Sequence, residues 1–131
     1  MAVTSIKAVF YCSKKRAWDV VTSLTDYSWR SDISRIEVVS DHQFIEHSKE
    51  GVATTFTITN TIPYEQWEFY LENENVEGHW TGTFKEHDGG TEITFTEDLN
   101  AKKVLLKPLL KNYMKKQQAQ YFEDLKKVLD F

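Results

Sequence analysis

The side chain best suited to proton-transfer chemistry is Glu97, which lies in residues 91–99. The apolar residues of this segment alternate with polar ones as in a β-strand; they are Ile93, Phe95 and Leu99. This register turns Glu97 toward the apolar side. A carboxyl group among aromatic side chains has its pKa raised by desolvation, which suits proton abstraction or donation near neutral pH. Glu97 is therefore the candidate catalytic residue.

A structural interpretation of Glu97 competes with this one. Glu97 lies near the end of its segment, beside Asp98, and its carboxylate could reach water or the Lys102/Lys103 pair. We favour the structural interpretation, because the register at a strand end is the least secure part of an assignment from sequence.

Three further polar side chains, Tyr113, Gln117 and Tyr121, are spaced four residues apart near the C-terminal end. On a helix this spacing puts them on one face, one turn apart. A purely structural seam more often carries aliphatic residues there, whereas a helix that closes a cavity over a ligand needs a few polar tips. These side chains could orient a ligand's carbonyl or hydroxyl group, or they could bond to backbone groups at a cavity mouth.

The three polar residues belong to a long amphipathic helix, predicted from about Asn100 to Phe131. Its apolar stripe repeats every three or four residues, while the lysines fall mainly on the other side. A helix cannot bury such a stripe alone, so it requires a partner. Pro108 marks either the first turn of the helix or a bend. The stripe consists of Leu106, Leu110, Tyr113, Met114, Gln117, Tyr121, Leu125 and Val128.

The partner is predicted to be a curved antiparallel sheet of about seven strands, which gives an α+β fold in a single domain over residues 1–131. A first strand over 4–12 precedes a helix capped by Ser13 and a second short helical turn around 26–29. The later connections are too short for crossover helices, so six strands should form an antiparallel meander. These strands lie near 33–40, 43–49, 51–62, 65–73, 76–87 and 91–99.

Alternation within these strands predicts the side chains that face the helix, and aromatic residues dominate them. Gly78 and Gly82 lie among them, where they leave room or permit a bend. In residues 43–49 the pairs Phe44 with Glu46 and Ile45 with His47 compete for the inner face. The predicted ligand-binding set is Thr54, Phe56, Ile58, Asn60, Trp67, Phe69, Trp80, Phe84, Phe95, Glu97, Leu110, Tyr113, Met114, Gln117 and Tyr121.

Composition argues against several classes of function. The net charge of −4 is unfavourable for sequence-independent nucleic-acid binding, and the single cysteine excludes an internal disulfide. The four histidines lack metal-ligand spacing and no nucleotide-binding motif occurs, so we expect no metal and no cofactor. The first residues lack the apolar run of a signal peptide and no stretch has membrane-spanning length, so we expect a cytoplasmic protein without integral membrane contact.

Residues 102–116 carry six lysines and no acidic residue. We favour a solvated helix face for this segment. The alternative is a contact surface for an anionic partner or a membrane surface.

The order of these elements resembles the helix-grip fold of the START and pollen-allergen (SRPBCC) superfamily, and in particular its bacterial polyketide cyclase/dehydrase-like branch. The resemblance rests on residues 4–33, TSIKAVFYCSKKRAWDVVTSLTDYSWRSDI, with their Asp26-x-x-Trp29 step, and on the turn Asp88-Gly89-Gly90-Thr91. Members of that superfamily typically hold an apolar small molecule, often a lipid, sterol or aromatic polyketide, between the long helix and the sheet. A minority do chemistry on it.

Two functions follow from these observations. The first is binding of an apolar or aromatic small molecule without turnover. The second is a cyclase, dehydratase or isomerase that uses Glu97 with Tyr113 or Tyr121 as proton-transfer groups. We favour binding, because the sequence shows no convergent pair of titratable groups. An interaction protein that uses the lysine-rich helix face is a third alternative.

Overall fold

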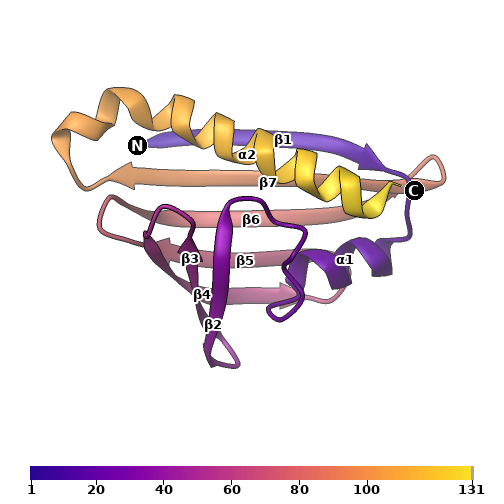
Figure 1. Ribbon diagram of the computed structural model, residues 1–131. Helices are drawn as coiled ribbons and strands as arrows, with labels where there is room; N and C mark the ends of the chain where they lie inside the picture. Colours follow the sequence, from indigo (N-terminus) through magenta and orange to yellow (C-terminus); the bar gives the residue numbers. More distant parts are fainter. Residues whose placement is uncertain (131) are drawn as a thin grey trace.

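The computed structural model describes residues 1–130, which form one seven-stranded antiparallel sheet with two α-helices on one of its faces (Figure 1). The strands lie in the order β1-β7-β6-β5-β4-β3-β2. The predicted α+β architecture and antiparallel meander are confirmed. The elements are β1 (Ala2–Phe10), α1 (Lys14–Thr22), β2 (Ile33–Ser40), β3 (Gln43–Ser48), β4 (Ala53–Ile62), β5 (Gln66–Glu72), β6 (Val76–His87), β7 (Gly90–Ala101), a 3-10 helix η1 (Val104–Leu106) and α2 (Lys107–Leu129).

Only one of the two predicted short helices forms. α1 has the predicted cap, since Ser13 Oγ accepts a hydrogen bond from the Arg16 backbone N–H at 3.1 Å. The predicted second helical turn is wrong as a helix. There the Asp26 N–H donates to Ser23 Oγ and the Arg30 N–H donates to the Tyr27 carbonyl, so the segment makes turns without continuing into a helix.

The long helix begins later than predicted. β7 extends to Ala101, η1 follows, and α2 starts at Lys107 with Pro108 in its first turn, which is the first of the two predicted alternatives. Proline is tolerated there because a first-turn N–H has no partner within the helix. Phe131, where the prediction ended the helix, lies outside the described residues.

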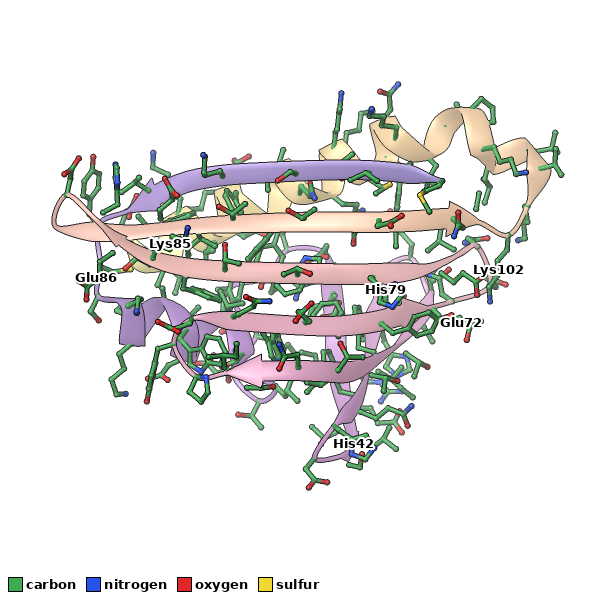
Figure 2. The ribbon with its side chains drawn as sticks, turned by 180° about the vertical axis from the view of Figure 1, so that it is seen from behind. His42, Glu72, His79, Lys85, Glu86 and Lys102 are labelled. Carbon is green, nitrogen blue, oxygen red and sulfur yellow. The ribbon has the colours of Figure 1, made fainter. Side chains whose placement is uncertain are left out.

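α2 runs along β1 and β7, at one side of the sheet, while β2 crosses the strands steeply on the same face (Figure 1). The opposite face of the sheet carries no helix (Figure 2). Its side chains are mainly polar, and His79 of β6 lies among them. The space enclosed by the curved sheet is therefore on the α2 side only.

The buried face of α2 is rotated from the predicted stripe. Its buried residues are Leu110, Met114, Gln118, Phe122, Asp124, Leu125 and Leu129. Phe122 makes edge-to-face contacts with Phe10 of β1 and Phe95 of β7, at centroid distances of 5.3 and 5.0 Å. The predicted residues Tyr113 and Gln117 are exposed instead. The prediction failed here because α2 packs on β1 and β7. The side of the helix that carries Tyr113 and Gln117 therefore faces the strands that the helix does not cover.

Two of the six lysines in residues 102–116, Lys102 and Lys103, contact side chains at the end of β5 and in the turn that follows it. Lys102 Nζ lies 2.7 Å from Glu72 Oε2 (the pair is labelled in Figure 2), and Lys103 Nζ donates to Asn75 Oδ1. A contact surface on this segment stays a prediction. Neither helix within residues 1–130 combines the length and the apolar composition needed to cross a membrane.

The contact of Phe122 with β1 and β7 predicts a large loss of stability when it is truncated. Phe122→Ala should lower the free energy of unfolding by about 3–5 kcal/mol, measured by urea denaturation, because a buried aromatic ring leaves a cavity. Leu109→Ala on the same helix is the control, since Leu109 is 61% exposed. Equal losses for the two variants would contradict the packing described for α2.

Candidate functional site

A cavity of about 440 Å³ lies between α2, the concave face of the sheet and the segment that joins α1 to β2. Aromatic and aliphatic side chains together make up most of its walls. The aromatic lining residues are Tyr27, Trp29, Phe44, Phe56, Trp67, Phe69, Trp80, Phe95, Tyr113 and Tyr121. A cavity of this size and character falls within the range of small-molecule sites.

The aromatic rings of the sheet support one another. Trp80 stacks on Phe69 with centroids 4.5 Å apart, and Phe44 stacks on Phe56 at 4.9 Å. Gly82 makes this possible, since a Cβ at that position would lie 2.5 Å from the Trp80 indole ring. The room left by Gly82 is therefore filled by Trp80, and the indole forms part of the cavity wall.

Glu97 points into this cavity from β7. It is paired with Trp80 of β6 and with Thr4 of β1, so that the three side chains emerge on the same face of the sheet. Burial, with a smaller contribution from the charge of Glu46, raises the pKa of Glu97 to about 7. Among residues 1–130 its carboxyl group has no hydrogen-bond partner. Its direction fits the catalytic interpretation, and its role stays a prediction.

Thr4 adds a second unpaired polar group beside Glu97. Its side-chain Oγ1 is buried and has no hydrogen-bond partner within the described chain. The neighbouring Gln118 of α2 donates instead to the Thr4 backbone carbonyl, at 3.4 Å. Glu97 in the cavity wall and Thr4 beside it on β1 are thus two oxygen-bearing side chains whose hydrogen-bonding capacity is unused.

Another part of the wall is built around Arg30. The guanidinium donates to both carboxylate oxygens of Asp32 at 3.0 Å and to both of Glu46 at 3.2 Å. It also lies over the Tyr121 ring, 4.7 Å from the centroid. Burial would lower the pKa of Arg30, but the two carboxylates and Tyr121 hold it well above its ordinary value. Arg30, Asp32 and Glu46 therefore form a cluster of one cation and two anions whose positions are set by these hydrogen bonds.

Asp124 of α2 fastens this wall to the helix. One of its oxygens, Oδ2, accepts from the Ser31 backbone N–H at 2.8 Å and from the Ser31 hydroxyl at 2.7 Å, while the other accepts from Gln120 Nε2. Burial would raise the pKa of Asp124, but these hydrogen bonds bring it below its ordinary value. Ser31 is next to Arg30, so the clamp fixes the arginine against α2.

The two cavity tyrosines remain protonated. Burial raises the pKa of Tyr121 well above its ordinary value, and it also raises that of Tyr113. Tyr121 contacts Trp29 and Phe95 edge-to-face at 5.3 and 5.1 Å, whereas Tyr113 is 55% exposed. Each phenol can donate a hydrogen bond to a ligand, but neither is suited to accept a proton.

Eleven of the predicted site residues line the cavity: Thr54, Phe56, Trp67, Phe69, Trp80, Phe95, Glu97, Tyr113, Met114, Gln117 and Tyr121. Gln117 and Tyr113 come from the exposed side of α2. The structure therefore brings together most of the side chains that the alternation patterns singled out.

Four predicted residues, Ile58, Asn60, Phe84 and Leu110, are not in the lining. The β4–β5 register shifts between Ile58 and Asn60, and this irregularity turns Asn60 outward to donate to Glu68 Oε2 at 2.8 Å. Phe84 packs edge-to-face on Trp18 of α1, with centroids 5.3 Å apart. Leu110 borders a separate small hollow. These four residues do not line the cavity, and a binding role for them stays a prediction.

The main residues that sequence reasoning missed are Arg30, Asp32, Glu46 and Gln118. Arg30 and Asp32 lie in an irregular segment, where no periodicity reports the direction of a side chain. Glu46 had a signal, since the choice of Phe44 for the inner face of β3 also turns Glu46 inward. Phe44 is buried and Glu46 lines the cavity. Within residues 1–130, no three His, Cys, Asp or Glu side chains are grouped as metal ligands.

Residues 1–130 match the family described as polyketide cyclase / dehydrase and lipid transport. The chain belongs to this family. No curated protein matches the chain. The family match confirms the predicted resemblance to the polyketide cyclase/dehydrase-like branch. The solved structures below confirm the predicted START-like fold.

Solved structures repeat this fold at low sequence identity. A START superfamily protein from Mycobacterium smegmatis has a TM-score of 0.89 at 11% identity, over 97% of this chain and 96% of that one. The protein XoxI from Bacillus cereus has a TM-score of 0.85 at 11% identity, over 98% and 96%. DynU16, from the dynemicin biosynthetic locus, has a TM-score of 0.75 at 11% identity, over 95% of this chain and 46% of its own.

The raised pKa of Glu97 predicts how stability depends on pH. Its pKa is about 7 in the folded chain against an ordinary value of 4.5, so the folded state holds the proton more tightly. The stabilisation from the protonated form is complete below pH 4.5 and is lost as the pH rises through 7. Relative to wild type, Glu97→Gln should therefore gain roughly 3 kcal/mol of unfolding free energy between about pH 4 and pH 8.5.

The measurement is urea denaturation of both proteins across this pH range. Glu86→Gln is the control, because it removes an exposed carboxylate of β6 (labelled in Figure 2). A stability difference between Glu97→Gln and wild type that stays constant with pH would show that Glu97 is not buried as described.

Proposed function

We propose that the chain binds an apolar or aromatic small molecule, such as a lipid, a sterol or a polyketide-like compound, between α2 and the sheet. The observation that carries this proposal is the cavity of about 440 Å³, most of whose lining residues are aromatic or aliphatic. Burial of a ligand's apolar surface against these walls supplies the free energy of binding.

The construction of the walls supports this proposal. The stacked pairs of β3 to β6 and the Arg30 ion cluster hold the lining side chains in place without a ligand. A preformed site loses less conformational entropy when it binds. The family description, which includes lipid transport and polyketide chemistry, agrees with this class of ligand.

A second candidate function is a cyclase- or dehydratase-type enzyme. The specific observation in its favour is Glu97, an unpaired carboxyl group with a pKa of about 7 that faces the cavity. Because both tyrosines stay protonated, proton abstraction would rest on Glu97 alone, with Tyr113 or Tyr121 as hydrogen-bond donors. In that case Glu97→Gln should abolish turnover while the affinity for substrate changes little. Retained turnover would remove Glu97 from the mechanism.

Filling the cavity tests the binding proposal. Ile36 of β2 lines the cavity, so Ile36→Trp should reduce the affinity for bound ligands by at least about tenfold, because its larger ring occupies ligand space. Native mass spectrometry of the purified protein and tryptophan-fluorescence titrations with fatty acids, sterols and flavonoids measure the uptake.

Val39→Trp is the matched control. Val39 lies on the same strand and is 51% exposed, so the same substitution there should leave uptake unchanged. If wild type takes up none of these compounds, or if Ile36→Trp binds them as well as wild type does, the cavity is not the binding site.

A further inference from the structure

The charged side chains that line the cavity are mostly acidic. Four carboxylates, from Asp32, Glu46, Glu50 and Glu97, face two cations, from Arg30 and Lys49. Lys49 and Glu50 are exposed in the turn between β3 and β4. The interior thus has one cation against three carboxyl groups, and an anionic ligand group would enter a site that already has an excess of negative charge.

Arg30 is not available to a ligand. A guanidinium has five N–H donors in a fixed plane. In this cavity Nε and both terminal nitrogens already donate to Asp32 and Glu46, in four hydrogen bonds. The side chain that would normally recognise a carboxylate is therefore occupied by two carboxylates of the protein itself.

Two oxygen-bearing side chains of the sheet have unused hydrogen-bonding capacity: the Glu97 carboxyl group in the cavity wall, which accepts when it is ionised, and the Thr4 hydroxyl beside it, which can donate and accept. Glu97 has no hydrogen-bond partner among residues 1–130, and Thr4 Oγ1, buried beside it, has none either. A buried acceptor without a partner costs free energy, which a ligand that brings a donor would recover. A ligand that brings only acceptors would leave the ionised Glu97 unpaired.

Two aromatic side chains lie next to Glu97 on the same face of the sheet. Trp80 is paired with Glu97 across β6 and β7, and the Phe95 ring lies 4.6 Å from that of Trp80. The faces of such rings attract a cation. A carboxylate flanked by aromatic rings is a combination suited to an amine.

From these contacts we infer that the cavity selects ligands whose polar end is a hydrogen-bond donor, an ammonium group above all and a hydroxyl group next, which bonds to Glu97. Ligands that end in a carboxylate are selected against. This inference rests on the proposed binding function and specifies the class of ligand.

The discrimination should depend on pH through Glu97. Thr4 of β1 and Trp80 of β6 are its neighbours on the sheet, and the charge of Glu46 acts on it. The other charged or polar groups from the packed elements that line the same cavity are Tyr113, Gln117, Gln118 and Tyr121 of α2 and Arg30 and Asp32 of the α1–β2 segment. Because the Glu97 pKa is about 7, the carboxyl group is mainly ionised at higher pH and then favours an ammonium group. At lower pH it is protonated and can donate to a carboxylate, so the discrimination should weaken.

Isothermal titration calorimetry with three probes of one skeleton tests the inference: 4-phenylbutylamine, 4-phenyl-1-butanol and 4-phenylbutyrate. At about pH 8 the amine should bind at least about tenfold more tightly than the carboxylate, with the alcohol between them. At about pH 6 this ratio should fall severalfold. Glu97→Gln removes the charge at nearly constant size, so it should reduce the amine-to-carboxylate ratio to about threefold or less while the affinity for the alcohol stays within about twofold.

Tightest binding of 4-phenylbutyrate, equal binding of the three probes, or an unchanged ratio in Glu97→Gln would overturn this inference and leave the proposed function intact. If none of the three probes binds and the fatty acids, sterols and flavonoids are not taken up either, both proposals are overturned. Asp41→Asn, which removes an exposed carboxylate in the β2–β3 turn, is the control and should keep the wild-type ratio.

Discussion

The contact of α2 with β1 and β7 is the constraint on which the cavity depends. Phe122 lies between Phe10 and Phe95, and this packing sets the helix against one side of the sheet. A helix is about 10 Å across with its side chains, so it cannot also cover the concave strands β3 to β5. The volume left over is the cavity. Leu129 and Leu125 extend the same packing to the end of the helix, and both are buried.

Partly buried ions form another part of the cavity wall. An ion pair in the interior costs desolvation energy that often equals its Coulombic gain, so the Arg30 cluster is weak evidence for stability. Its effect here is positional: two bidentate contacts and the Asp124–Ser31 clamp hold an irregular segment against α2. Regular secondary structure would supply such rigidity through its backbone. The α1–β2 segment lacks it, and side-chain hydrogen bonds take its place.

The sequence predicted the parts of this structure that obey a period. Alternation in β5 to β7 placed Trp67, Trp80 and Glu97 correctly, because a strand inverts side-chain direction at every residue. It failed at Asn60, where one shift of register reverses all later directions. It also failed on α2, where Gln117 and Gln118 are identical in type and only the docking angle of the helix decides which of them is buried. Arg30 was beyond prediction, since Glu46 of β3 and Tyr121 of α2 come to lie beside it only in the folded chain.

At Glu97 the structure departs from what packing alone would select. Its neighbours are rings, it lacks a hydrogen-bond partner in the described chain, and a leucine or methionine there would satisfy the core at lower cost. The adjacent Thr4 hydroxyl makes the same departure. Two unpaired polar groups on neighbouring strands, both on the concave face of the sheet, are unfavourable for folding but favourable for recognising a polar group that enters from outside. The unpaired groups lower the stability of the fold but can bind a polar group of a ligand. This is the physical reason to propose that the cavity is a binding site and not a packing defect.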